Sequence, residues 1–271
     1  MSTAVRHPSA RRAPPPIPFP LLLGVLIAVL VSAIGLRWPR GEDTTGALAR
    51  QTRSGGLRSR PAAVGPPQCE YRDVPTPRAE YSDWKTTLLD SSYALPSTYS
   101  PPDLVLAEGA GFGGGFLVRA FVLEDLAALG AAAEASGNPL DLAAAYRSYA
   151  QQDDLFRRRV ATLGRARALE RTARPGHSEH QLGTAVDFKS RGAADVTVAW
   201  AKTAEGRWME ANAHRFGFVM TYPAGSAGVT CYGFEPWHFR YFGRALAMKI
   251  HTSGLTPREY LWALQRRGAS N

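Results

Sequence analysis

The sequence contains little cysteine, no internal repeat, and no charge over one long stretch near its start. Two cysteines in 271 residues are too few for a fold built from disulfides, and too few for a zinc finger with thiolate ligands. Charged residues make up 20% of the chain and hydrophobic residues 45%, a balance that excludes a wholly disordered chain, a collagen and a coiled coil. The length is sufficient for one large domain or two small ones.

The positive charge of the chain is concentrated at its beginning. The net charge is +9 at pH 7, and residues 1–66 hold nine arginines and two acids, which gives this segment +7. The remaining 205 of the 271 residues carry only +2. Because the body of the protein is nearly neutral, the composition argues against a nucleic-acid partner.

An uncharged apolar stretch separates Arg12 from Arg37. Residues 17–36 are apolar apart from two prolines and one serine, and such a stretch is long enough to cross ~30 Å of hydrocarbon as a helix. We therefore predict a basic cytoplasmic tail over residues 1–16 and a single-pass transmembrane signal anchor over residues 17–36. The alternative is a signal peptide that is cleaved near Val31-Ser32-Ala33.

Residues 37–66 are rich in arginine, glycine, serine, threonine and alanine, and contain little that could form a core. This composition predicts a flexible linker. Residues 67–271 then form the folded domain, which we expect on the extracytoplasmic side of the cell membrane. A domain of about two hundred residues buries roughly 70% of the surface of its unfolded chain, which is enough for one core.

Helix and strand patterns are interleaved along the folded domain. The apolar spacing and the capping residues predict helices over residues 121–136, 149–163, 205–216, 245–251 and 256–266. Short apolar segments predict strands over residues 140–146, 182–188, 218–222 and 238–242. The fold class that follows is α+β, with a small antiparallel sheet and flanking helices.

Two short segments contain the residues best suited to catalysis. One runs from Gly176 to Asp187, and the other is Glu235-Pro236-Trp237-His238. A catalytic zinc site uses three protein ligands and leaves one position open for water. His180, Asp187 and His238 could supply two imidazoles and a carboxylate. Glu235 lies three residues before His238, where it could take a proton from the metal-bound water without being a ligand.

The order and spacing of these residues resemble the VanY-type zinc D-Ala-D-Ala carboxypeptidases. The shared pattern is Ser178-x-His180-x-x-Gly183-x-Ala185-x-Asp187 followed by Glu235-x-x-His238. Upstream, Tyr146-Arg147-Ser148-Tyr149-x-x-Gln152 matches a further segment of that family. The similarity covers roughly residues 80–252. Where the family often has Ser-Gly before Tyr-Arg, this chain has Ala144-Ala145, a change that removes no catalytic group.

The resemblance implies a role for each catalytic residue. His180, Asp187 and His238 would bind zinc. Glu235 would act as general base toward water and then as general acid toward the leaving amine. Arg147 would polarise the scissile carbonyl and stabilise the oxyanion, because a fixed cation there faces developing negative charge. The implied partner is the peptidoglycan stem peptide, from which the terminal D-Ala is removed.

The residues expected to contact substrate, and some of the catalytic ones, have structural alternatives. The candidates for substrate contact are Ser178, Gln152 and Trp237. Trp237 is equally well explained as a core aromatic residue, and Arg147 could instead pair with Asp153 or Asp154. His177 is a rival metal ligand to His180. A basic run between residues 157 and 174 is either a solvated helix face or a basic wall that attracts an anionic peptide or glycan.

The two cysteines are predicted to form a disulfide between Cys69 and Cys231, because the domain is expected outside the membrane. The alternative makes Cys231 a thiol nucleophile seven residues before His238. Ser82 and Lys85 fit the Ser-x-x-Lys pattern of penicillin-binding serine carboxypeptidases, but the partner motifs of those enzymes are missing.

The sequence as a whole predicts a membrane-tethered zinc D-Ala-D-Ala carboxypeptidase of the bacterial cell wall. An L,D-carboxypeptidase or an endopeptidase acting on peptidoglycan peptides could use the same metal site on the same scaffold. A non-catalytic wall-binding module is a further alternative. The presence of all four zinc-site residues argues against a decayed site.

Overall fold

The structure is a computed structural model, and it describes residues 65–268. The predicted tail (1–16), the predicted transmembrane anchor (17–36) and the predicted linker up to residue 64 lie outside this range. Within residues 65–268, none of the helices combines the length and the apolar composition that a bilayer crossing requires.

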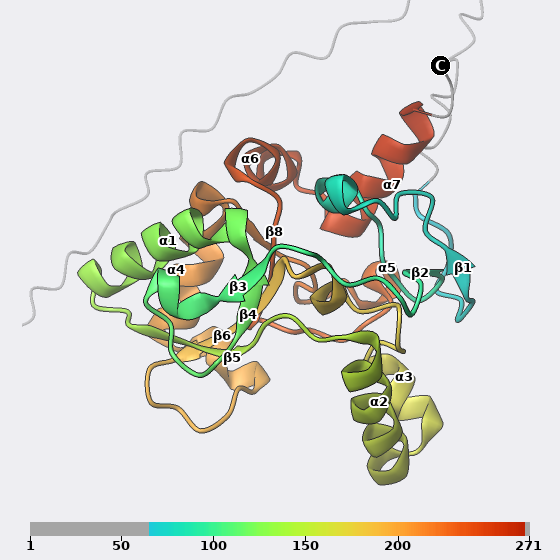
Figure 1. Ribbon diagram of the computed structural model, residues 1–271, viewed down its shortest axis with the longest axis horizontal. Helices are drawn as coiled ribbons and strands as arrows, with labels where there is room; N and C mark the ends of the chain where they lie inside the picture. The colour runs from blue at the N-terminus through green and yellow to red at the C-terminus, as the bar shows by residue number, and fades with distance from the viewer. Residues whose placement is uncertain (1–64, 269–271) are drawn as a thin grey trace, which may run out of the picture. The chain divides into compact units, whose positions relative to one another are not determined.

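Helices and short strands alternate along the described chain (Figure 1), in agreement with a mixed α and β fold. The helices are α1 (Leu123–Ala135), α2 (Tyr149–Leu163), α3 (Arg165–Arg171), α4 (Ala204–Asn212), α5 (Ala227–Thr230), α6 (Arg244–Ser253) and α7 (Pro257–Gly268). The strands are β1 (Val74–Pro75), β2 (Tyr93–Ala94), β3 (Leu104–Leu106), β4 (Leu117–Arg119), β5 (Leu140–Ala144), β6 (Ala185–Ser190), β7 (Phe218–Met220) and β8 (His238–Tyr241).

The central sheet contains four strands in the order β5-β6-β8-β7, and each strand is antiparallel to its neighbours. This is the small antiparallel sheet that the sequence predicts. The register of β6 against β8 places Asp187 opposite His238. A shift in register on β5 also places Ala144 opposite Asp187. Two further pairs stand apart from this sheet: β1 with β2, which are parallel, and β3 with β4, which are antiparallel.

The alternation of side chains along β6 and β8 separates the core from the site. Val186 and Phe188 of β6 and Phe239 of β8 are buried in the largest apolar cluster, together with residues of α1. Successive side chains of a strand point to opposite faces. Asp187 and His238 therefore lie on the face of the sheet that this apolar cluster leaves free.

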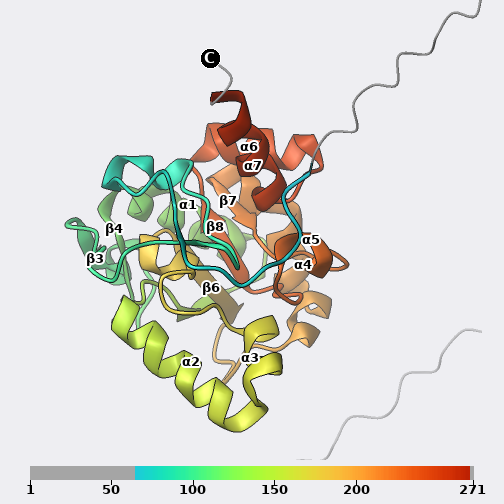
Figure 2. The ribbon, with the colours of Figure 1, turned by 90° about the vertical axis from the view of Figure 1, so that its right-hand side faces the viewer.

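Helices α2 and α3 lie side by side at the end of the domain away from α6 and α7 (Figures 1 and 2). The first of them begins as predicted, because the Ser148 hydroxyl accepts from the backbone N–H of Gln151 and the Gln151 side chain accepts from the backbone N–H of Ser148. This reciprocal capping box satisfies two amides that the first helical turn leaves unpaired. Arg147, directly before the cap, is thereby held at a defined position.

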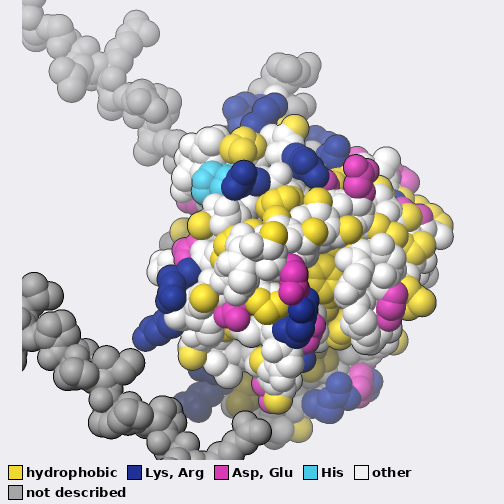
Figure 3. All heavy atoms as spheres, turned by 90° about the vertical axis from the view of Figure 1, so that its left-hand side faces the viewer, with side chains coloured by type: hydrophobic (Ala, Val, Ile, Leu, Met, Phe, Trp, Pro, Cys, Tyr) yellow, Lys and Arg dark blue, Asp and Glu magenta, His cyan; other side chains and the backbone are white. Residues whose placement is uncertain are grey.

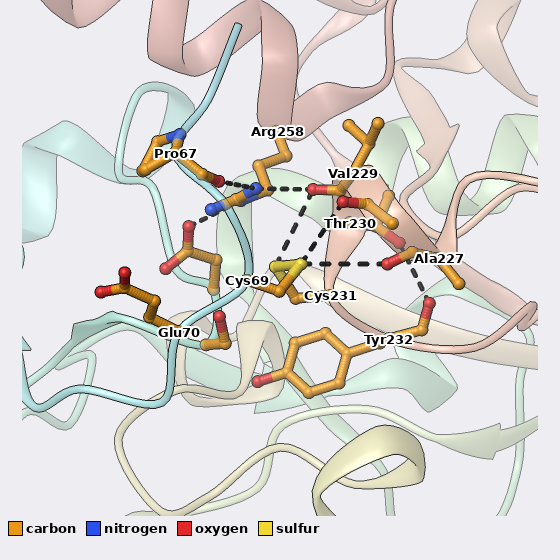
Figure 4. The surroundings of a disulfide bond; sticks show 12 residues. Pro67, Cys69, Glu70, Ala227, Val229, Thr230, Cys231, Tyr232 and Arg258 are labelled. Carbon is orange, nitrogen blue, oxygen red and sulfur yellow. Dashed lines mark hydrogen bonds and ion pairs between the residues drawn. A yellow bond between two sulfur atoms is a disulfide. The ribbon is translucent and has the colours of Figure 1, made fainter.

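A disulfide joins Cys69 to Cys231 across 162 residues of sequence (Figure 4). Beside it, the buried side chain of Arg258 from α7 donates to the Asp90 carboxylate at 2.7 Å and to the Pro67 carbonyl at 3.2 Å. The same guanidinium donates to the Val229 carbonyl at 2.6 Å. The disulfide and Arg258 thus connect the start of the domain to the segment before Glu235 and to α7.

The predicted strand over residues 182–188 is wrong at its start. Residues Glu179–Leu182 form a 3₁₀ turn, and β6 begins only at Ala185. Between them, Gly183 has a φ of +71°, which glycine adopts without steric cost. A side chain at this position would also collide with Arg119, since a Cβ would lie 2.9 Å from its Cγ.

Candidate active site

The three predicted metal ligands meet on the free face of the central sheet. His180 lies on the 3₁₀ turn, Asp187 on β6 and His238 on β8. One ligand atom from each lies within 4.8 Å of the other two. His180 Nε2 is 3.4 Å from one carboxylate oxygen of Asp187, and His238 Nδ1 is 3.0 Å from the other.

The second nitrogen of each histidine ring is engaged by a buried acceptor. His180 Nδ1 lies 2.7 Å from the carbonyl oxygen of Ala145, so Nδ1 carries the proton and Nε2 keeps its lone pair. His238 Nε2 lies 2.9 Å from the Glu179 carboxylate, and its Nδ1 is the nitrogen that faces Asp187. Metal-binding histidines characteristically donate their other ring N–H to a carbonyl or carboxylate. Both rings therefore turn their other nitrogen toward Asp187.

Glu179 is a buried carboxylate that the sequence analysis passed over. It accepts hydrogen bonds from His238, from Thr221 Oγ1 at 2.8 Å and from Arg240 Nη1 at 2.9 Å. Burial alone would raise its pKa, but Arg240 and His238 outweigh burial and hold the pKa of Glu179 at about 2. The residue is thus a fixed anion behind His238. Its position directly before His180 is the one sign of its role in the sequence. Its partners, Thr221, His238 and Arg240, are more than 40 residues away along the chain.

The charge states of Asp187 and His180 suit a divalent cation. Burial raises the pKa of Asp187, but the adjacent His180 and His238 more than offset it and keep this pKa below its ordinary value. Burial lowers the pKa of His180, which favours its neutral, ligating form. Two imidazole nitrogens and one carboxylate form the donor set of a catalytic zinc site with one open position. The residues present therefore fit zinc.

The metal-ligand group lies in a cleft of about 440 Å³, which Glu235 and Arg147 also line. Glu235 is half-buried, and its backbone N–H donates to the Tyr222 carbonyl at 3.1 Å. Burial raises the pKa of Glu235 to about 7; Asp187 adds to this effect, while His238 and Arg147 oppose it. A carboxylate of this kind can accept a proton near neutral pH and release it again.

Arg147 is held by Gln152 and not by the acids that follow it. Its Nη1 donates to Gln152 Oε1 at 2.7 Å, and Gln152 Nε2 donates to the Ala173 carbonyl at 2.6 Å. Asp153 and Asp154 pair instead with arginines one turn further along α2. The Gln152 side chain is only 1% exposed, so its amide is occupied in orienting Arg147.

The other two candidates for substrate contact also line the cleft. Ser178 is buried, and its hydroxyl accepts from the backbone N–H of His180 at 3.4 Å. Trp237 is half-buried. It packs against the main core and also lines the cleft, so it is a core aromatic residue that could in addition contact substrate. The cleft wall further includes Tyr222 and Tyr232, which the sequence analysis did not single out.

The structure does not support His177 as a metal ligand, Cys231 as a nucleophile, or Ser82 and Lys85 as a catalytic pair. His177 is buried away from the ligand group, with its ring nitrogens 2.7 Å from the Asp90 carbonyl and 2.9 Å from the Asp73 carboxylate. Cys231 is part of the disulfide and has no free thiol. Ser82 and Lys85 belong to a 3₁₀ turn, and neither lines the cleft.

Comparison with known proteins matches this arrangement to one family. The profile of VanY, described as D-alanyl-D-alanine carboxypeptidase, matches residues 116–244, which contain all the ligands named above. A D-alanyl-D-alanine carboxypeptidase of Enterococcus faecalis (strain ATCC 700802 / V583) is 32% identical over 193 residues, 68% of this chain and 68% of that protein. The chain spans between 34% and 68% of the length of the curated relatives that it matches.

Two solved structures share the fold. The LdcB LD-carboxypeptidase superposes with a TM-score of 0.59 at 35% identity, over 65% of this chain and 84% of that one. A variant of the vancomycin-resistance D,D-pentapeptidase VanY from a VanB-type cassette, in complex with Zn(II), superposes with a TM-score of 0.57 at 31% identity. That alignment covers 66% of this chain and 99% of the other. The chain belongs to the VanY family of D-alanyl-D-alanine carboxypeptidases.

Proposed function

We propose that this protein is a zinc-dependent D-alanyl-D-alanine carboxypeptidase that removes the terminal D-Ala from peptidoglycan stem peptides. The observation that carries the proposal is the gathering of His180, Asp187 and His238 in one cleft with Glu235 and Arg147. These five residues provide a metal site, a titratable carboxylate and a fixed cation. A metal-dependent peptidase can use each of them.

His180, Asp187 and His238 would hold the metal. Zinc bound there would lower the pKa of a water molecule toward ~7 and polarise the scissile carbonyl. The hydrogen bonds from His180 to Ala145 and from His238 to Glu179 fix both rings in the orientation that ligation needs. These two hydrogen bonds would keep both ligands in place around the metal.

Glu235 would move the proton in both halves of the reaction. In its ionised form it would accept a proton from the attacking water, and in its protonated form it would return that proton to the amine of the departing D-alanine. A pKa raised by burial brings both forms within reach near neutral pH. Arg147, oriented by Gln152, would stabilise the negative charge that develops on the carbonyl oxygen.

The test is release of D-alanine by the full chain. A peptide ending in D-Ala-D-Ala is incubated with the zinc-loaded protein, with and without a chelator, and the products are weighed by mass spectrometry. Loss of one alanine that the chelator abolishes would support the proposal. An intact peptide in the presence of stoichiometric zinc would contradict it.

A second candidate is cleavage of the L,D bond in a tetrapeptide that ends in a single D-Ala. The observation that favours it is the similarity to the LdcB LD-carboxypeptidase, which has the higher identity of the two superposed structures. The metal site serves either bond. Offering the tetrapeptide and the pentapeptide in one reaction separates the two, because each product has its own mass.

We further propose that residues 17–36 anchor the protein in the cell membrane with the catalytic domain on the extracytoplasmic side. The uncharged apolar stretch and its flanking arginines support this orientation. The disulfide agrees with an oxidising compartment. Protease added to intact spheroplasts should degrade the catalytic domain. Protection of that domain until the membrane is broken would contradict the topology.

A further inference from the structure

The cleft carries positive charge that the proposed reaction does not use. Arg159 of α2 and Arg171 at the end of α3 both line it. Both side chains are exposed. Within residues 65–268, neither guanidinium takes part in an ion pair or a side-chain hydrogen bond. Two cations without partners thus face the space in which the substrate must lie.

The other arginines of α2 are neutralised by their own helix. Arg157 pairs with Asp153 at 2.9 Å, and Arg158 pairs with Asp154, each four residues earlier. Arg159 has no acid at the matching position, because residue 155 is a leucine that also lines the cleft. The unpaired arginine is therefore the one that faces the site.

The cleft-lining residues of α2 form one stripe along the helix. Leu155 and Arg159 follow Gln152 by three and seven residues, and this spacing places all three on the same face of the helix. Gln152 holds Arg147 at the catalytic end of the stripe. Arg159 lies seven residues further, about 10 Å along the axis at ~1.5 Å per residue. An extended peptide covers that distance in about three residues.

The remaining charges around this part of the cleft do not cancel the arginines. Asp195, from the segment after β6, is the one further acid of the lining outside the catalytic group. Lys189, also of the lining, donates to the Ala193 carbonyl at 2.7 Å. Away from the metal centre, the described cleft wall therefore has an excess of positive charge.

We propose that Arg159 and Arg171 bind a carboxylate of the peptide that lies two to three residues on the amino side of the scissile bond. The inference rests on the proposed function: a carboxypeptidase substrate has one residue beyond the cleaved bond, so a distant contact must fall on the amino side. A guanidinium matches a carboxylate in both charge and planar geometry. The enzyme then prefers stem peptides with a free acid to those in which this acid is amidated.

The experiment compares two N-acetylated pentapeptides that both end in D-Ala-D-Ala. One carries glutamate at the second and third residues, and the other carries glutamine there. D-Alanine release by the full-length zinc-loaded protein is measured for wild type, for Arg159→Gln/Arg171→Gln, and for the control Arg157→Gln/Arg167→Gln. The control removes the same charge from the same two helices at residues that do not line the cleft.

We expect wild type to favour the acidic peptide by roughly tenfold or more in kcat/KM, mainly through KM. The cleft variant should lose that preference while it keeps its zinc and its activity on the neutral peptide, and the control should retain it. Equal turnover of both peptides by wild type would overturn the inference and leave the proposed function standing. An equal loss of preference in the control would also overturn it, because the effect would then come from net charge alone. Absence of D-alanine release from either peptide would overturn the proposed function, and the inference with it.

Discussion

At the scale of single residues, each ring in the ligand group has one nitrogen held by an acceptor behind it and the other directed at Asp187. The Ala145 carbonyl engages His180, and the Glu179 carboxylate engages His238. Asp187 lies between the other two ring nitrogens, and both histidines hold its pKa below the ordinary value despite its burial. The site therefore depends on an acceptor behind each ring as much as on the ligands themselves.

Replacing Glu235 should abolish most of the catalytic activity without affecting zinc binding. Glu235→Gln should retain zinc, because Glu235 is not among the clustered ligand atoms. It should lower kcat by about 10²–10⁴-fold, the usual contribution of a general base. Zinc content and D-alanine release measured on one sample decide the matter. Loss of the metal from this variant would identify Glu235 as a ligand.

Removing the charge behind His238 should weaken the metal site. Glu179→Gln keeps the size of the side chain but leaves Arg240 without its carboxylate and His238 without a strong acceptor. Zinc affinity should fall by about 10–100-fold in a chelator competition assay. Glu134→Gln serves as the matched control, since Glu134 is an exposed acid on α1 that pairs with Arg191. Equal affinity in the two variants would contradict the role of Glu179.

The protonation of Glu235 should be visible in the metal-free protein. Burial raises its pKa to about 7, so the carboxylate becomes protonated as the pH falls through that value and no longer serves as a base. A bound divalent cation favours the ionised form and should shift this pKa downward. Carbon-13 NMR of labelled glutamate, recorded with and without zinc, measures both values. A metal-free pKa near 4.5 would contradict this account.

Most of the site could be predicted from the sequence, but the roles of Glu179 and Gln152 could not. The histidine, aspartate and glutamate spacings identify the ligands and the base, because these residues lie close together in two short segments. Glu179 is different, since its role appears only when β8 pairs with β6 and brings His238 and Arg240 to it. Gln152 was assigned to substrate contact, although its amide holds Arg147.

At the scale of elements, the start of α2 couples the fold to the site. The capping box of Ser148 and Gln151 begins this helix directly after Arg147, and Gln152 in its first turn orients the guanidinium. A weakened cap should therefore affect catalysis as well as stability.

The cap can be tested against a matched one. Ser148→Ala and Thr203→Ala each remove the N-cap side chain of a helix, α2 and α4 respectively. Each should lower the free energy of unfolding by about 1 kcal/mol. Only Ser148→Ala should also lower kcat/KM, by roughly tenfold or more, because Arg147 loses its fixed position. Unchanged activity in Ser148→Ala would show that Arg147 is held by Gln152 alone.

The long elements were predictable and the short ones were not. The helix over residues 149–163 has an apolar stripe and a capping serine, and the structure has it with the same bounds. Helix α3 has arginine at three of its seven positions and no apolar stripe, so its sequence indicates only a basic run. Strands β3 and β4 have three residues each, too few to display a period, and glycines lie between them.

At the scale of the whole molecule, charge is distributed without a dominant sign over the folded domain. Figure 3 shows one face on which basic and acidic side chains are scattered among apolar ones. This agrees with the low net charge of residues 67–271 in the sequence. The concentration of arginine that does matter to the proposed substrate is local, in the cleft between α2, α3 and the sheet.

The disulfide should contribute strongly to the stability of the domain. It closes a loop of 162 residues, and cross-links of this kind stabilise a fold by about 2–5 kcal/mol, mainly by restricting the unfolded chain. Urea unfolding of Cys69→Ser/Cys231→Ser should show a lower midpoint than wild type. Added reductant should bring wild type to the value of the variant. Identical midpoints under oxidising conditions would contradict this expectation.

The same cross-link also determines how the domain would respond to force. With an anchor upstream, tension from the membrane enters the domain at its first described residues and reaches Cys69 almost at once. From there it crosses one sulfur–sulfur bond to Cys231, four residues before Glu235 (Figure 4). The 161 residues between the two cysteines, with the short β1–β2 pair and most of the sheet, lie outside this path. Tension between such an anchor and the segment that leads into Glu235 would therefore be borne by covalent bonds, and the β1–β2 pair would not be pulled apart.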